Sequence, residues 1–298
     1  MLLENPFLLN LKKSFRDKAP NLYLRVNALY SKLFEFSNEK AYLRGDIRSQ
    51  SEQDKTSLLL LSCNRAATQL VENLLRKIYE FDGGGYIALN RYLFFYGKEQ
   101  TIPYLDAEYM KEFMKPKGYF FGQQGPFDKH EAFTDYKKVV MCRDPRDLLV
   151  SHFYSFTQAH VPRNKHFVDK IAKAKQLGLQ KYVLEDEHIS YFKKCLEQAI
   201  LLRDKERVFF CRYEDMMDNF SVFQEKCQEF INGEVNAELS IKLNGMYKQP
   251  ELKQSTDNTR HRRSGAWGQF KTALEPDTIA KLNHEFKDLL HELDYPVE

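Results

Sequence analysis

The sequence predicts an α/β fold in which a central, mainly parallel sheet is flanked by helices, with a helical extension at the amino terminus. Short, continuous apolar runs, typical of buried parallel strands, alternate with segments whose apolar residues recur at helical spacing. Two of these runs end in short loops that carry arginines, and ligands bind at such loops in open α/β sheets. The 298 residues are enough for one large domain or two small ones.

Residues 1 to 50 make up the predicted helical extension. Its apolar stripe, which falls on one face of a helix, consists of Leu22, Val26, Leu29, Leu33 and Phe36. Gly45 and its polar neighbours are expected to end this region, because glycine favours the end of a helix. Residues 51 to 298 follow as a single predicted α/β domain without an internal repeat or a low-complexity linker.

Four strands and the helices between them are predicted within this domain. The predicted strands are Leu58 to Leu61, Gly118 to Gly122, Val139 to Cys142 and Val208 to Cys211. The predicted helices cover Leu70 to Ile78, Leu148 to Phe156, Ile189 to Leu202 and Pro276 to Leu293. Gly83 to Gly85 is predicted to be a turn, since no GxGxxG spacing follows a strand there, and the Walker pattern GxxxxGK[ST] is also absent.

The composition favours a cytoplasmic protein that binds neither nucleic acid nor membrane. The formal net charge is only +3, and the charged residues are well mixed along the chain. No stretch approaches the roughly 18 apolar residues of a membrane span, and no long apolar region follows a basic start. The cysteines share no metal-ligand spacing, so we expect reduced, mostly buried thiols and no metal site. They are Cys63, Cys142, Cys195, Cys211 and Cys227.

The segment from Lys137 to Phe156 is predicted to form a strand, a tight loop and a helix. Its apolar run stops at the sequence Arg143-Asp144-Pro145-Arg146-Asp147, after which apolar residues return at helical spacing. Asp147 is the expected helix cap, because its side chain can accept the first free backbone amides. Arg143 and Ser151, eight residues apart, would then converge near a helix amino terminus as an anion site, with phosphate as the expected ligand. A solvated charged loop is the alternative.

The loop after the first strand, Ser62 to Gln69, has the composition of a phosphate cradle. It is small and polar around Arg65 and leads directly into a helix. Backbone amides at the helix start could hold an anion, while Arg65 neutralises the charge and the Thr68 hydroxyl donates a hydrogen bond. The alternative is an ordinary capped turn between a strand and a helix.

Four segments together resemble the PAPS-dependent sulfotransferases of the cytosolic type. They are the Ser62 to Gln69 loop, the RDPRD stretch with Arg143 and Ser151, the YEDM-like segment Arg212 to Met216, and the RKGxxGxW-like segment Arg263 to Lys271. The resemblance spans roughly residues 57 to 293. It implies the P-loop-like three-layer fold of that family and sulfuryl transfer from PAPS, with PAP as the product and no metal.

The resemblance implies that the first loop binds the 5′-phosphosulfate end of PAPS. Arg65 takes the place of the family's lysine on the bridging and sulfonate oxygens. Thr68 and Gln69, with the backbone amides of Ala66 and Ala67, would hold the 5′-phosphate. The family has serine and glycine where Ala66 and Ala67 stand, so a hydroxyl and some flexibility are lost. Arginine keeps the charge of lysine but makes its point-like proton donation to the leaving group doubtful.

A second group of residues is implied to bind the 3′-phosphate and the base. It consists of Arg143, Ser151, Tyr213, Arg262, Arg263, Ser264 and Gly265. Arg143, Ser151 and one of the two later arginines would clamp the 3′-phosphate, the glycine would allow close backbone approach, and Tyr213 would meet adenine. The run Arg260 to Arg263 is expected to be a mobile basic loop. Two departures are Ser264, where lysine is common, and Phe270, where the family has tryptophan.

The catalytic base is the most serious departure from the family. Many relatives carry Lys-Thr-His at the end of the strand before the 3′-phosphate unit, whereas the aligned residues here are Gly122-Gln123-Gln124. Gln124 cannot take a proton, so His130 is the candidate general base, with a surface residue as the alternative. Further candidates are Glu131, His152 and His160. Without any such base, either the acceptor needs little help or the chain has lost activity.

The acceptor is expected to be a small molecule with a hydroxyl or an amine, such as a natural-product intermediate. Aromatic residues gather where the family builds part of its acceptor pocket, namely Tyr86, Tyr92, Phe94, Phe95, Tyr96, Tyr104 and Tyr109. With Asp106 and Glu108 close in sequence, they could hold a flat or cationic molecule. Core packing or a lid is the alternative.

Other functions stay open at this point. One is a PAPS- or PAP-binding protein that has lost catalysis because glutamine replaced the base. Another is a P-loop-like nucleotide kinase, which the missing Walker lysine and glycines disfavour. A scaffold that binds a protein partner through residues 1 to 50 is compatible with either.

Overall fold

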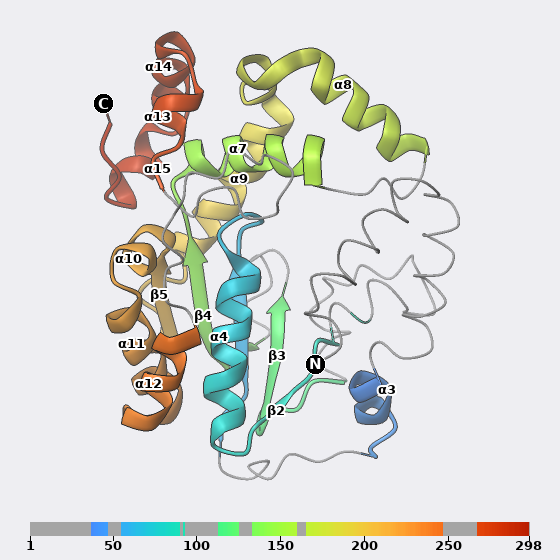
Figure 1. Ribbon diagram of the computed structural model, residues 1–298, viewed down its shortest axis with the longest axis vertical. Coiled ribbons are helices and arrows are strands. Elements are labelled where there is room, and N and C mark those ends of the chain that lie inside the picture. The colour runs from blue at the N-terminus through green and yellow to red at the C-terminus, as the bar shows by residue number, and fades with distance from the viewer. Residues whose placement is uncertain are drawn as a thin grey trace.

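A parallel sheet forms the centre of the computed structural model, which describes residues 37–46, 55–89, 92, 113–124, 133–159, 165–246 and 267–297 (Figure 1). In these residues a single five-stranded sheet has the order β2-β3-β1-β4-β5, and every pair of neighbours is parallel. In that order the strands are Gly85–Tyr86, Tyr119–Gln124, Leu58–Ser62, Lys137–Cys142 and Val208–Arg212. The central strand β1 is buried throughout, whereas the edge strands β2 and β5 are half-buried.

Helices surround the sheet. Those of the first half are α3 (Ser37–Leu43), α4 (Thr68–Phe81), α7 (Pro145–Tyr154), the π-helix η3 (Ser155–Ala159) and α8 (Lys165–Tyr182). Those of the second half are α9 (Asp186–Ile200), α10 (Tyr213–Asp218), α11 (Phe220–Asn232), α12 (Ala237–Met246), α13 (Phe270–Ala273), α14 (Pro276–Glu285) and α15 (Lys287–Glu292). In Figure 1, α7, α8, α13 and α14 lie beyond the end toward which the β4 arrow points, and α4 packs beside α11.

The two faces of the sheet bury different clusters, because successive residues of a strand point to opposite sides. Leu58 and Leu60 of β1 pack in one core with Leu75 of α4. Leu59, between them, packs in a second core with Tyr42 of α3 and Phe121 of β3. The unbroken leucine run of β1 is therefore explained by its position as a central strand that is covered on both faces.

The carboxyl ends of β1 and β4 lie at the point where the strand order reverses. From β1 the chain continues to β2 and β3 on one side, whereas from β4 it continues to β5 on the other side. Ligands of open α/β sheets bind at such a switch point. The loop 63–67 after β1 and the residues 143–144 after β4 both lie there.

The four predicted strands and the predicted helices are present, with three differences. The short edge strand β2 was not predicted, since two residues carry no detectable period. The predicted helix cap Asp147 is wrong: α7 begins at Pro145, and Asp144 is the cap, with its side chain accepting a hydrogen bond from the amide of Arg146. Proline suits the first helical position because it has no amide hydrogen to satisfy there.

The third difference lies at the carboxyl end, where one predicted helix is two. The chain leaves helical dihedral angles at Phe286, between α14 and α15. This break keeps the apolar residues of both helices in the core, since Leu282, Phe286 and Leu290 are all buried.

The predicted extension is described only over residues 37–46. There α3 packs on the sheet, with Tyr42 edge-on to Tyr119 and Phe121 and with a Glu39 carboxylate oxygen accepting a hydrogen bond from the amide of Ala88. Gly45, at φ 77°, follows the helix end as predicted. The boundary between extension and domain at residue 50 stays a prediction.

Two predictions from composition can be compared with the structure. None of the five cysteines, all of which lie in the described ranges, forms a disulfide, and all are buried, as predicted. Among the described residues, none of the helices combines the length and the apolar character needed to cross a bilayer.

Candidate functional site

The loop between β1 and α4 has an unusual backbone. Arg65 and Ala67 have φ angles of 79° and 54°, in the left-handed region that residues other than glycine rarely adopt. Each such residue costs about 1 kcal/mol, and such strain clusters at functional sites. Ala67 is the N-cap residue of α4, and no side chain from the described residues caps the helix. The first amides of α4 are therefore suited to an anionic ligand.

Hydroxyl groups stabilise the base of this loop. The side-chain oxygens of Ser62 and Thr68 lie 3.0 Å apart at hydrogen-bond distance, and Ser62 also donates to the carbonyl of Cys63. Ala66 is fully buried, which anchors the middle of the loop, whereas Gln69 is exposed. The Thr68 hydroxyl, predicted to donate to a phosphate, thus already takes part in the hydrogen bonding that shapes the loop.

The structure brings Arg65, Arg143 and Ser151 together, although they come from the loop after β1, the loop after β4 and α7. The Arg65 Nε donates a hydrogen bond of 3.3 Å to the Ser151 hydroxyl. An Arg143 Nη donates one of 3.2 Å to the Arg65 carbonyl oxygen. Two cationic side chains and a hydroxyl therefore converge at the switch point of the sheet, which is the composition of an anion site.

Arg143 is buried, with only 5% of its surface exposed. Its guanidinium lies 4.2 Å from the centre of the Tyr213 ring and donates to the Asp147 carboxylate at 3.1 Å. Its Nε atom is buried without a hydrogen-bond partner among the described residues. An unsatisfied buried donor is costly, so an acceptor from a ligand or from another part of the chain would stabilise this arrangement.

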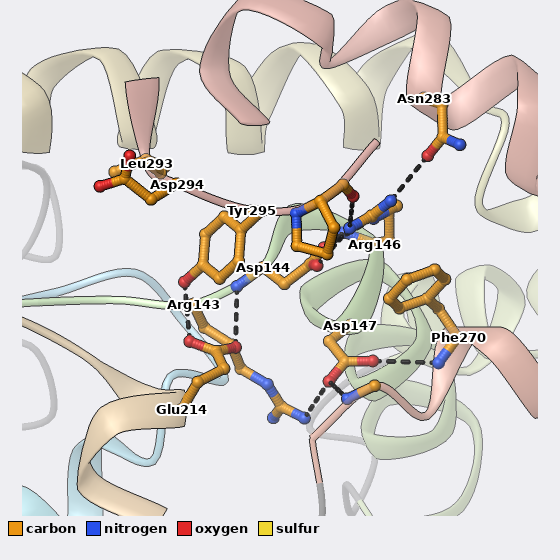
Figure 2. A network of polar contacts seen from close by, with 12 residues as sticks. Arg143, Asp144, Arg146, Asp147, Glu214, Phe270, Asn283, Leu293, Asp294 and Tyr295 are labelled. Carbon is orange, nitrogen blue, oxygen red and sulfur yellow. Dashed lines mark hydrogen bonds and ion pairs between the residues drawn. The ribbon is translucent and has the colours of Figure 1, made fainter. Parts of the chain in front are cut away.

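Asp147 joins Arg143 to the chain that follows residue 266 (Figure 2). One carboxylate oxygen accepts hydrogen bonds from Arg143 and from the amide of Gly268, and the other accepts one from the amide of Phe270. The sequence prediction assigned Asp147 only a capping role. Its position four residues after Arg143 was the available signal for an ion pair, although Arg143 itself lies before the helix.

Arg146 and Glu214 organise the other side of the same loop. The Arg146 guanidinium pairs with Asp144 at 2.7 Å, and Glu214 accepts hydrogen bonds from the Asp144 amide and from the Tyr295 hydroxyl. Burial raises the pKa of Glu214 above its ordinary value, while the Tyr295 hydrogen bond acts in the opposite direction. Tyr295 and Pro296, near the carboxyl end, are thereby held against the start of α7.

The candidate bases are only partly described. Gln124 is buried at the end of β3, and its amide nitrogen donates to the Phe121 carbonyl at 2.7 Å. His152 lies in an aromatic cluster, where its Nδ1 is 2.9 Å from the Tyr182 hydroxyl, with Phe192 edge-on to its ring. These contacts give His152 a role in packing. The other candidates, His130, Glu131 and His160, lie outside the described residues.

Other predicted site residues also lie outside the described ranges. They are Arg260, His261, Arg262, Arg263, Ser264 and Gly265 of the basic segment, and Phe94, Phe95, Tyr96, Tyr104, Asp106, Glu108 and Tyr109 of the acceptor region. Of the aromatic group, Tyr86 donates a hydrogen bond to Glu72 of α4, and Tyr92 packs against the core that contains Phe121. Both observations fit core packing for these two tyrosines.

Comparisons with known proteins identify a family and a shared fold. The model of the sulfotransferase domain family matches residues 126–294. Mouse sulfotransferase SULT7A1, crystallised with PAP, has a TM-score of 0.53 at 15% identity, with 80% of this chain and 85% of that chain covered. Retinol dehydratase, in complex with androsterone and the inactive cofactor PAP, has a TM-score of 0.52 at 16% identity, with 78% and 80% covered. No curated protein sequence matches the chain at a significant level.

At these identities, the two structures show a shared fold only. The matched family segment covers more than half of the chain and contains β4, α7, β5 and the carboxyl-terminal helices. The predicted fold and the predicted family resemblance are confirmed.

Proposed function

This chain belongs to the sulfotransferase domain family, and we propose that it transfers the sulfuryl group of PAPS to a hydroxyl or an amine of a small molecule. The observation that carries this proposal is the convergence of Arg65, Arg143, Ser151 and Tyr213 at the switch point of the sheet. The buried Arg143 Nε without a partner among the described residues suits an anionic ligand there. PAP occupies two related folds, which supports this nucleotide as the ligand.

We assign the two arginines to different ends of the nucleotide. Arg143, with Ser151, would hold the 3′-phosphate, and the Tyr213 ring would lie against the base. Arg65 and the amides of residues 67 to 69 would hold the 5′-phosphosulfate, since the Ala66 amide already donates to the Cys63 carbonyl at 3.3 Å. The basic residues Arg262 and Arg263, with Ser264 and Gly265, are proposed to complete the 3′-phosphate site.

The protein's contribution to catalysis would be orientation and charge stabilisation. PAPS, when bound, supplies the sulfuryl group and is released as PAP. Sulfuryl transfer resembles phosphoryl transfer, in which the protein does little covalent chemistry. Arg65 and the amides at the start of α4 would stabilise charge that develops on the leaving phosphate, an effect worth roughly 3 to 4 kcal/mol per donor. Arg65→Ala should therefore lower turnover far more than nucleotide affinity.

At the acceptor site, transfer to a hydroxyl or an amine calls for a group that takes up its proton. Gln124 cannot act as a base, and its amide is already bonded to the backbone of β3. His130 therefore remains the proposed base for a hydroxyl or amine of a small molecule, such as a natural-product intermediate. Gln124 also supports a second candidate function, a PAPS- or PAP-binding protein without catalysis.

Calorimetric titration with 3′,5′-ADP tests the proposal, with 5′-ADP and ATP as controls for the additional phosphate. We expect tight binding of 3′,5′-ADP alone, after which PAPS turnover on a panel of acceptors separates the enzyme from the non-catalytic binder. Equal binding of all three nucleotides, or no binding, would sink the assignment of Arg143 and Ser151. Preferred binding of ATP would favour the nucleotide kinase instead.

A further inference from the structure

The geometry points to Asp147 as a positioning residue for the 3′-phosphate site. We propose that its carboxylate holds the Arg143 guanidinium and the chain at Gly268 to Phe270 in one arrangement, and that recognition of the 3′-phosphate depends on this arrangement. The inference rests on the proposed function and adds to it a residue that would not touch the nucleotide.

The contacts of Asp147 come from two distant parts of the chain. One oxygen accepts from Arg143 Nη2 at 3.1 Å and from the Gly268 amide at 2.8 Å, and the other accepts from the Phe270 amide at 3.0 Å. Gly268 is 121 residues away in sequence, and Asp147 is 1% exposed. Because both oxygens accept from fixed donors, the plane of the carboxylate is set, and with it the direction from which Arg143 is held.

A role through charge alone predicts the opposite result from a positioning role. A carboxylate beside an anion site repels phosphate, and it neutralises the arginine that should attract it. Removing the charge of Asp147 should therefore tighten phosphate binding if electrostatics alone mattered. If Asp147 acts by orientation, its removal weakens binding, because a misdirected guanidinium loses its hydrogen bonds to the phosphate oxygens. The sign of the change separates the two accounts.

Asn and Glu at position 147 disturb the geometry in different ways. Asp147→Asn removes the charge and leaves a single acceptor oxygen for donors that now occupy two oxygens. Asp147→Glu keeps the charge but moves the carboxylate by one methylene group. Charge alone predicts tighter binding in Asp147→Asn and unchanged binding in Asp147→Glu, whereas positioning predicts weaker binding in both.

Asp144, the cap of the same helix, offers a matched control. It is also buried and pairs with an arginine, but its partner is Arg146, with hydrogen bonds of 3.0 and 2.7 Å from Nε and Nη2. Asp144→Asn should lower stability as Asp147→Asn does. It should leave the ratio of the dissociation constants for 5′-ADP and 3′,5′-ADP unchanged.

The experiment is calorimetric titration of the full-length wild type and the three variants with 3′,5′-ADP and 5′-ADP, below their measured melting temperatures. We expect the Kd for 3′,5′-ADP to rise about tenfold or more in both Asp147 variants, with the Kd for 5′-ADP changed by less than about twofold. Equal or tighter binding of 3′,5′-ADP, or equal weakening of both nucleotides, would overturn the inference. If Asp147→Asn does not fold, Asp147→Glu decides by the same criteria. Wild type that does not distinguish the nucleotides would refute the proposed function itself.

Discussion

Arg143 lies in the loop after β4 and Arg146, three residues later, in the first turn of α7, yet their guanidinium groups point into different surroundings (Figure 2). Every nitrogen of the Arg146 guanidinium donates a hydrogen bond, to Asp144, Asn283 or the carbonyl of Pro296, and the group stacks 4.0 Å from the Phe270 ring centre. Arg143 is also buried, but its Nε has no partner within the described part of the chain.

Burial and ion pairing therefore do not distinguish a structural arginine from a ligand-binding one. Both arginines are buried, and each pairs with an aspartate at the start of α7. What differs is whether the donors are all used, and whether the neighbouring backbone is relaxed or strained. Arg143 bonds to the carbonyl of Arg65, which has a left-handed backbone, whereas Arg146 fastens the loop to the carboxyl terminus.

Arg146→Ala should give the largest loss of stability. It leaves the Asp144 carboxylate buried without its cation, a change that costs about 3 to 5 kcal/mol. The exposed Arg44, whose pair with Asp46 is worth less than about 1 kcal/mol, provides the control variant Arg44→Ala. Urea unfolding measures both. If Arg146→Ala loses no more unfolding free energy than Arg44→Ala, the structural role of Arg146 is wrong.

Arg143→Ala should act on binding. Losing charge-assisted hydrogen bonds to the 3′-phosphate costs about 2 to 3 kcal/mol, so the Kd for 3′,5′-ADP should rise by about 100-fold. The Kd for 5′-ADP should change by less than about threefold, and calorimetry measures both. Stability should fall less than in Arg146→Ala, because Asp147 keeps the amides of Gly268 and Phe270 as donors. Equal affinity of variant and wild type would contradict the clamp.

Tyr295→Phe tests the structural contacts at the carboxyl terminus. We expect a smaller loss of stability than in Arg146→Ala, and one that depends on pH. It removes the donor to the buried Glu214 carboxylate, a loss of about 1 to 3 kcal/mol at pH 7. Burial holds the pKa of Glu214 above its ordinary value, so this group makes the protein less stable as pH rises from about 4.5 through the folded pKa.

Without the Tyr295 hydroxyl that pKa rises further, and the difference between wild type and Tyr295→Phe should grow from pH 4 to pH 7. Thermal unfolding at both pH values measures it. Tyr191→Phe, which removes a solvent-exposed hydrogen bond from the Asn64 amide, is the control, expected within about 0.5 kcal/mol of wild type. A difference that shrinks as pH rises would rule out an ionised Glu214 as its source.

Ala67→Gly should have the smallest effect and the opposite sign. Ala67 has φ 54°, where glycine avoids a penalty of about 1 kcal/mol, so we expect a gain in unfolding free energy of up to about 1 kcal/mol. Ala172→Gly, at an exposed position of α8, should instead lose about 0.5 to 1 kcal/mol. If both variants lose stability to the same degree, the loop after β1 is not strained.

Local patterns of the sequence were sufficient for most of the fold. The leucine run of β1, the helical spacing in α4 and α9, and the loops after β1 and β4 depend on residues that are close in the chain, so the sequence alone determined them. The edge strand β2 was too short to show a period, and the break at Phe286 preserves the apolar spacing that suggested one helix.

Long-range contacts, which the sequence does not show, give Arg146 and Asp147 their roles. The cap is an exception, because Pro145 at the first helical position is a local signal that already favours Asp144 over the predicted Asp147. Asp147 instead meets Gly268, and Arg146 meets Asn283, across 121 and 137 residues. No local period records such contacts, because they form only when the sheet has brought the carboxyl-terminal helices over the ends of β4 and β5.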